Sequence, residues 1–213
     1  MKTDELIDLL AADAHPVARH TVEQRLAVAA FAGIAGAAVL MLALFGLRSD
    51  LAATMAMPMF WGKLAFAGTL AAAGLMVLQR MARPGVPAGR AALWLALPPL
   101  VLWGLALATL AQAAPAERLP LILGNTWRTC PFNIAVLSVP AFVAGFWALK
   151  GAAPTHLAWA GAGAGLLAGA LGALVYALHC PEMATPFLAV WYLAGMAVPT
   201  AVGAVAGPRW LRW

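Results

Sequence analysis

Residues 26–47 read LAVAAFAGIAGAAVLMLALFGL, an unbroken apolar stretch without a charged side chain. A helix rises about 1.5 Å per residue, so about 20 such residues cross the hydrocarbon core of a bilayer. The stretch does not alternate between apolar and polar residues, and it is about twice as long as a membrane-spanning strand. It therefore predicts a transmembrane helix.

Five further stretches have the same character, and they cover most of the remaining chain. Of the 213 residues, 64% are hydrophobic and 10% are charged, which is too little polar surface for a soluble domain of this length. We predict an all-α polytopic membrane protein with a cytoplasmic segment at residues 1–24 and a six-helix domain at residues 25–213. The expected spans are Leu26–Leu47, Phe60–Leu78, Ala91–Ala111, Phe132–Leu149, Leu157–Leu178 and Phe187–Ala206.

The distribution of Lys and Arg predicts the orientation, because basic residues concentrate on the cytoplasmic side of a membrane. With both termini inside, the inner segments carry Lys2, Arg19, Arg25, Arg80, Arg83, Arg90, Lys150, Arg209 and Arg212. The outer segments then carry only Arg48, Lys63, Arg118 and Arg128. We expect a bacterial inner-membrane protein with cytoplasmic termini, and no basic cluster dense enough to bind nucleic acid directly.

The N-terminal segment has the pattern of a short amphipathic helix. Residues 3–14 read TDELIDLLAADA, in which Leu6, Leu9 and Leu10 fall on one apolar stripe. The acidic positions beside this stripe are Asp4, Glu5, Asp8 and Asp13. Helices that lie on anionic lipid favour basic residues, so a basic groove on a partner protein is the better fit. The alternative is that the helix folds back onto the protein's own cytoplasmic loops.

The two cysteines are each followed by proline, as Cys130-Pro131 and Cys180-Pro181. Both fall at the predicted outer surface, at the start of span four and after the end of span five. Because these spans are antiparallel, we expect the thiols to lie close together, with Cys130 as the N-cap of span four. A structural disulfide, a redox-responsive or metal-responsive switch, and two thiols without function are the alternatives.

Two further features concern the outer end of span five and its packing face. His179, beside Cys180, is a possible third ligand for a soft metal ion, although the spacing is not that of a structural zinc site. Gly161, Gly165 and Gly169 recur every four residues in span five, which favours close helix packing over a pore-lining role.

Several function classes are disfavoured by what the sequence lacks. No span contains an Asp or Glu, and Lys63 lies near an outer end where its amine can extend to the interface. No phosphate loop, zinc-protease motif or CxxC pair is present, so neither an enzyme nor a cofactor is predicted. A membrane thiol–disulfide electron carrier and a small-solute transporter remain the alternative functions.

The combination of these features resembles the NrsF-type membrane anti-sigma factors, a family named for negative regulation of sigma factor F. The resemblance rests on the opening MKTDELIDLL of residues 1–10, on Pro16-Val17, on six spans, and on two Cys-Pro units at outer ends. It implies that the segment around Asp4, Leu6, Leu9 and Leu10 holds an extracytoplasmic-function sigma factor at the membrane. It also implies that periplasmic Cys130 and Cys180 sense heavy-metal or oxidative stress.

Overall fold

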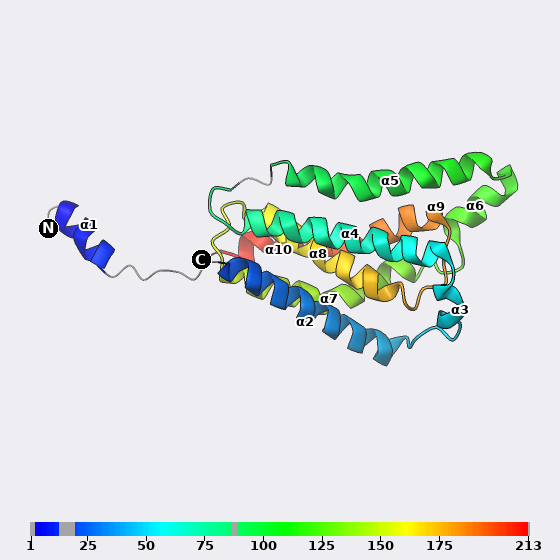
Figure 1. Ribbon diagram of the computed structural model, residues 1–213, viewed down its shortest axis with the longest axis horizontal. Coiled ribbons are helices and arrows are strands. Elements are labelled where there is room, and N and C mark those ends of the chain that lie inside the picture. The colour runs from blue at the N-terminus through cyan, green and yellow to red at the C-terminus, as the bar shows by residue number, and fades with distance from the viewer. Residues whose placement is uncertain (1–2, 13–19, 87–88, 213) are drawn as a thin grey trace.

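The structure, a computed structural model, describes residues 3–12, 20–86 and 89–212. Six long helical segments run side by side along its long axis (Figure 1), and each is long and apolar enough to cross a membrane. The described residues contain no strand, so the predicted all-α, six-span fold is confirmed. The segments are α2 (Thr21–Leu44), α4 (Pro58–Met81), α5 (Ala91–Gln112), α7 (Cys130–Lys150), α8 (Leu157–Tyr176), and a last one formed by α9 (Thr185–Phe187), the π-helix η1 (Leu188–Tyr192) and α10 (Leu193–Trp210).

Helix α8 is the centre of the bundle. In its most apolar 18-residue stretch 67% of the residues are buried, and the helix packs on α10, α7, α4 and α2. In contrast, α5 is only 11% buried and contacts mainly α4, α9 and η1. Figure 1 shows α5 along one edge of the bundle. Its side chains are therefore mostly left to face lipid, which suits their apolar character.

The glycines of α8 allow α10 to approach it closely. A methyl group added at Gly161 would collide with the carbonyl oxygen of Gly203, and one at Gly165 with the carbonyl oxygen of Pro199. At Gly169 the added carbon would lie 2.9 Å from Cα of Met196. All three predicted packing glycines therefore lie against the backbone of α10 and not on an open channel surface.

Two short helices lie at the end of the bundle that carries the cysteines, and the sequence patterns did not indicate them. They are α3 (Leu51–Met55) and α6 (Pro115–Leu123). Trp191 Nε1 donates a hydrogen bond of 2.8 Å to the carbonyl oxygen of Ile122, which ties the end of α6 to η1. The loops at this end are thus more structured than simple connections.

The opposite end of the bundle carries the C-terminus and most of the basic residues outside α1. There Arg83, just past the end of α4, pairs with Glu23 in the first turn of α2. A methyl group added at Gly151, past the end of α7, would collide with the Arg25 guanidinium. The start of α2 and the end of α10 therefore lie at the end of the bundle opposite the cysteines (Figure 1).

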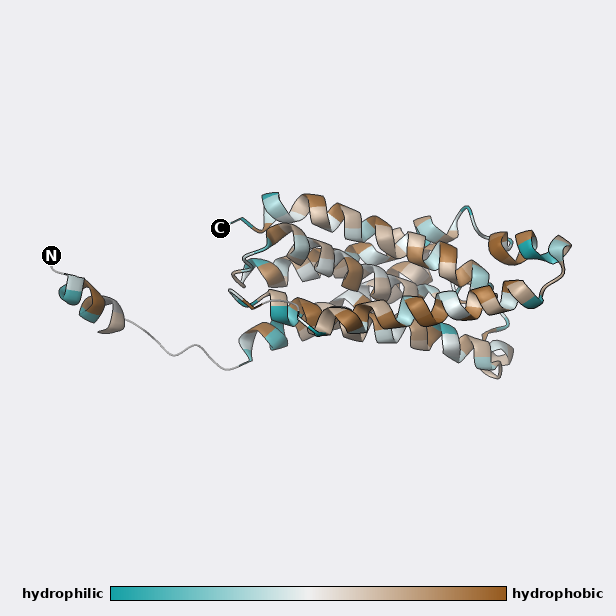
Figure 2. Cartoon of the chain, turned by 90° about the horizontal axis from the view of Figure 1, so that it is seen from above, coloured by the Kyte–Doolittle hydropathy of each residue, from teal (hydrophilic) through white to brown (hydrophobic). Residues whose placement is uncertain are grey.

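Helix α1 (Thr3–Ala12) carries Asp4 and Glu5 in its first turn. Its apolar side chains Leu6, Ile7 and Leu9 are 40%, 57% and 64% exposed. Figure 2 shows apolar and polar residues side by side on this short helix. The side chain of Leu10 lies outside the described part of the structure, as does the Pro16-Val17 unit on which the family resemblance partly rests.

A buried thiol pair at one end of the bundle

The two cysteines meet beneath the loops at one end of the bundle. Both are fully buried, with exposed fractions of 0%, and both are free thiols. Their side chains lie close enough together to interact electrostatically. The expectation that antiparallel spans bring them together is therefore met. The N-cap of α7 is Thr129, however, so Cys130 is the first residue of the helix and not its cap as predicted.

Local backbone structure sets the position of each thiol. Cys130 N–H donates to the carbonyl oxygen of Thr126 at 2.9 Å, and Pro131 occupies the next position, where the missing N–H costs nothing. Cys180 N–H donates to the carbonyl oxygen of Tyr176 at 2.9 Å, in the turn that ends α8. The two Cys-Pro units thus mark one helix start and one helix end.

Lys63 of α4 also reaches this site, which corrects the prediction that its amine extends to the interface. Its exposed fraction is 0%. Nζ donates to the carbonyl oxygens of Cys180 at 2.9 Å and Glu182 at 3.1 Å. It also lies 5.8 Å from the ring centroid of Tyr192, a favourable position for a cation. The backbone after α8 bends back over α4, and it offers the amine two acceptors inside the protein.

A second cation contacts the same carbonyl from the surface side. Arg48, in the connection after α2, donates from Nη1 to the carbonyl oxygen of Cys180 at 3.3 Å. The rest of its guanidinium forms two hydrogen bonds of 2.6 and 2.7 Å to the Asp50 carboxylate. The hydrogen bond from Arg48 lowers the pKa of Asp50. Arg48 therefore links the α2–α3 connection to the segment that carries Cys180.

Glu182 holds the loop in front of α7 against the Cys180 segment. Its Oε1 accepts hydrogen bonds from the backbone N–H of Asn125 at 2.7 Å, from the backbone N–H of Thr126 at 3.1 Å and from the Thr126 hydroxyl at 3.2 Å. Gly124 precedes them with φ +55°, and a methyl group there would lie 2.6 Å from Glu182 Oε2. The close approach of this carboxylate therefore requires glycine at 124.

Two buried tyrosines complete the surroundings of the thiols. Tyr176 OH accepts a hydrogen bond of 3.3 Å from Asn133 Nδ2. Tyr192 OH faces the sulfur of Cys180, and within the described residues it has no regular hydrogen-bond partner. The π-helical turn of η1 includes Tyr192, and such turns often occur at functional positions.

The two thiols are not chemically equivalent. The neighbouring Cys130 thiol lowers the pKa of Cys180 to about 6 against the opposing effect of burial. The positive charge of Lys63 acts in the same direction. Because the thiolate is the nucleophile and the metal ligand, Cys180 is the sulfur of the pair that is prepared to react first.

His179 does not join the sulfurs in this structure. Its Nδ1 lies 3.0 Å from the carbonyl oxygen of Gly46, and its ring packs 5.5 Å from that of Phe45 and 5.9 Å from that of Tyr176. Across the described residues, no three His, Cys, Asp or Glu side chains converge as a metal site would require. Metal ligation by Cys130, Cys180 and His179 together stays a prediction, and it needs a different arrangement of His179.

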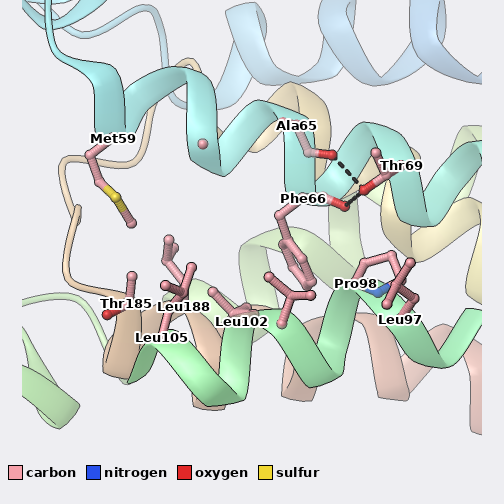
Figure 3. Close-up of a pocket in the computed structure, with 12 residues that line it drawn as sticks. Met59, Ala65, Phe66, Thr69, Leu97, Pro98, Leu102, Leu105, Thr185 and Leu188 are labelled. Atoms are coloured by element: carbon pink, nitrogen blue, oxygen red, sulfur yellow. Dashed lines mark hydrogen bonds between the residues drawn. The ribbon is translucent and has the colours of Figure 1, made fainter. Parts of the chain in front are cut away.

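A separate cavity of about 340 Å³ lies between α4 and α5 (Figure 3). Its lining is almost entirely apolar and includes Met59, Phe66 and Leu102. The Thr69 hydroxyl in its wall already donates to the backbone of Ala65 at 2.7 Å. The polar side chains in its described lining, Thr69 and Thr185, are both already hydrogen-bonded.

Sequence reasoning found the thiols but missed the groups around them. Lys63 and Arg48 bind the Cys180 backbone, Glu182 ties down the preceding loop, and Tyr192 faces the sulfur. Only Lys63 left a signal, as a lone charge within an apolar span. Such a charge is costly and therefore marks a functional position by default.

Comparisons with known proteins bear on the whole chain. The model of a family described as NrsF, negative regulator of sigma F, matches residues 10–213. A probable anti-sigma-F factor NrsF of Azospira oryzae is 48% identical over 213 residues, and the anti-sigma-F factor NrsF of Caulobacter vibrioides is 40% identical over 219 residues. Both alignments cover 100% of each chain. No solved structure matches. With a family match over nearly its whole length and two full-length relatives above 30% identity, the chain belongs to the NrsF family of negative regulators of sigma F.

Proposed function

We propose that this chain is a non-enzymatic anti-sigma factor of the bacterial inner membrane. It holds an extracytoplasmic-function sigma factor at the cytoplasmic face and releases it when Cys130 and Cys180 react on the periplasmic side. The observation that carries the proposal is the buried thiol pair, with one acidic thiol, at the end of the bundle opposite the start of α2 and the end of α10.

The sigma factor is proposed to bind the N-terminal segment. In α1 the apolar side chains Leu6, Ile7 and Leu9 are exposed beside acidic Asp4 and Asp8. A ten-residue helix is marginal in water by itself, so an exposed apolar stripe gains stability from a partner's groove. Its acidic positions favour a basic groove. The sigma factor itself, and not this chain, would contact nucleic acid.

The proposed orientation follows the charges. Nine basic positions fall on the side of the termini and four on the side of the cysteines, which supports cytoplasmic termini and periplasmic thiols. The periplasm is oxidising, so disulfide chemistry is available there.

Two reactions fit the thiol pair. With a two-electron oxidant of the peroxide class, the two thiols lose two protons and two electrons and form one S–S bond, while the peroxide is reduced to water. With a soft divalent metal ion, the thiols release two protons and bind the ion as thiolates. Either reaction changes the distance between the sulfurs, and therefore how the start of α7 packs on the end of α8.

An electron carrier explains the molecule less well. Both sulfurs lie at one end of the bundle, and none of the described helices carries a further cysteine toward the other end. Electrons would therefore have no thiol route across the membrane. The exposed apolar stripe of α1 would also have no role in such a carrier.

The test uses the intact protein in its own membrane, with a sigma-dependent reporter as the readout. Cys130→Ser and Cys180→Ser are expected to abolish induction by peroxide and by cadmium, whereas Thr129→Ser, at the exposed neighbouring position, should respond as wild type. In parallel, the solubilised chain is purified under reducing conditions and bound sigma factor is identified by mass spectrometry. Full induction in both serine variants would refute the sensor role, and recovery without any sigma factor would refute the binding role.

A further inference from the structure

The backbone carbonyls of Cys180 and Glu182 are held by cations from two other parts of the fold. Lys63 reaches both carbonyls from inside the bundle, at 2.9 and 3.1 Å, and Arg48 reaches the first from the surface at 3.3 Å. Lys63 belongs to α4, and Arg48 to the connection after α2. The short segment beside the reactive thiol is therefore the place where α4 and the end of α2 are joined to the end of α8.

Packing alone does not account for a lysine at position 63. Moving an ammonium group out of water costs several kcal/mol, and an apolar side chain of similar length would fill the same space without that cost. Among the described residues no carboxylate forms an ion pair with Nζ, and Glu182 Oε1 is engaged by Asn125 and Thr126. The partners that offset the cost are the two carbonyl oxygens and the neighbouring sulfur of Cys180. Both hydrogen bonds recorded for Nζ go to the Cys180 segment, so the contact depends on where that segment lies.

We propose that Lys63 is a positioning residue that joins α4 to the Cys180 segment in the inhibitory state, and that reaction of the thiols breaks this joint. The inference rests on the proposed function and adds the residue through which the thiols act on the helices. A reaction that draws the two sulfurs together, or places an ion between them, displaces Cys180. Displacing Cys180 moves its carbonyl oxygen away from Lys63 Nζ and leaves a buried ammonium with fewer partners. That state is costly unless α4 shifts as well.

The far end of α4 is paired with the start of α2. Arg83, two residues beyond the last residue of α4 at Met81, pairs with Glu23 in the first turn of α2. Helix α2 is the first helix after the proposed sigma-binding segment. A displacement of α4 therefore acts directly on the start of the helix that follows α1. The Arg83–Glu23 ion pair is thus a second contact, at the opposite end of the bundle, through which a shift of α4 would reach α2.

The experiment places Lys63 downstream of the thiols by combining variants. Lys63→Met keeps the approximate length of the side chain but removes its charge and its hydrogen-bond donors. Lys63→Arg keeps the charge and the donors. Each is made in the wild-type chain and in the Cys130→Ser/Cys180→Ser chain, and sigma-dependent reporter activity and co-purified sigma factor are measured without oxidant or metal. Arg118→Met, which removes an exposed cation at the same end, is the matched control. Membrane abundance and thermal unfolding of each variant are recorded.

We expect Lys63→Met to raise reporter activity roughly tenfold in both chains, with a matching loss of co-purified sigma factor. Lys63→Arg and Arg118→Met should stay repressed. Two results would overturn the inference. The first is that adding Lys63→Met to the double serine chain leaves its reporter activity unchanged. The second is that Lys63→Arg raises reporter activity as much as Lys63→Met does, with both proteins at normal abundance. If Lys63→Met fails to accumulate, Arg48→Met replaces it. Partial derepression then supports the joint, and none overturns it.

Failure of the proposed sensing function can be distinguished from failure of the inference about Lys63. If the double serine chain is still induced by peroxide and by cadmium, the proposed sensing function fails whatever Lys63 does. If the double serine chain is not induced and Lys63→Met behaves as wild type, only the inference about Lys63 fails.

Discussion

Substitution of Gly165 by alanine tests how the bundle is held together. A methyl carbon at this position would lie 2.6 Å from the carbonyl carbon of Pro199 and 2.8 Å from Cα of Thr200. Carbon atoms in contact prefer about 3.5–4.0 Å, and both neighbours are backbone atoms that no rotamer change can move. Helices α8 and α10 must therefore separate by roughly 1 Å along their shared seam.

The expected loss of stability follows from two opposing effects. Extra methyl groups in a well-packed interior cost about 1–3 kcal/mol, and a backbone collision belongs at the upper end of that range. Alanine regains up to about 1 kcal/mol because it favours the helix more than glycine does. We expect Gly165→Ala to lower the free energy of unfolding by about 1–2 kcal/mol.

Gly104→Ala is the matched control, because a methyl group at Gly104 on α5 would meet nothing within 4 Å. It keeps the gain in helix propensity and adds no collision, so its stability should equal or slightly exceed that of the wild type. The two variants are compared by titrating the purified proteins in mixed micelles with a denaturing detergent and following tryptophan fluorescence. Equal changes in both variants, within about 0.5 kcal/mol, would show that the α8–α10 seam is not as tight as the structure has it.

Three further predictions concern the thiols, the N-terminal helix and the loop. The rate at which a small reagent alkylates Cys180 should rise with pH around a midpoint near 6. Cys130→Ala should move that midpoint upward, because it removes the thiol that lowers the pKa of Cys180. Mass spectrometry after timed quenching measures the alkylation rate of both proteins. Leu9→Asp should reduce co-purified sigma factor at least about tenfold without changing membrane abundance, since a buried leucine contributes about 1.5–3 kcal/mol to binding; undiminished binding would rule out this face. Glu182→Leu should lower the free energy of unfolding by about 1–3 kcal/mol by leaving the two N–H groups it binds without an acceptor, whereas a stability equal to wild type would mean that water replaces the carboxylate.

The membrane-spanning helices were predictable because hydropathy alone determines them. The predicted spans begin and end within a few residues of the observed helices, as for Leu157–Leu178 against α8 at Leu157–Tyr176. Helices α3 and α6 were missed because, at 5 and 9 residues, they are too short to leave a clear period. Tertiary contacts, and not local pattern, hold them in place.

The site was predictable only in part, for a related reason. The meeting of Cys130 and Cys180 follows from the order of two antiparallel spans, which the sequence reveals. The direction of Lys63 does not follow from its position, because a lysine near a helix end can extend outward to water or inward to carbonyl groups. The choice depends on where residues 180–182, more than a hundred positions later, return to the bundle.

The complete burial of both sulfurs determines what can reach them. With exposed fractions of 0% at Cys130 and Cys180, a large thiol enzyme cannot place its own cysteine against either sulfur while the loops stay closed. A peroxide molecule or a single metal ion needs only a transient gap. While they stay closed, the loops around the pair therefore exclude proteins and admit only small reagents. Closed loops would also slow the reverse reaction, so in the proposed sensor a signal would outlast the chemical that caused it, until a small reductant enters or new protein replaces the old.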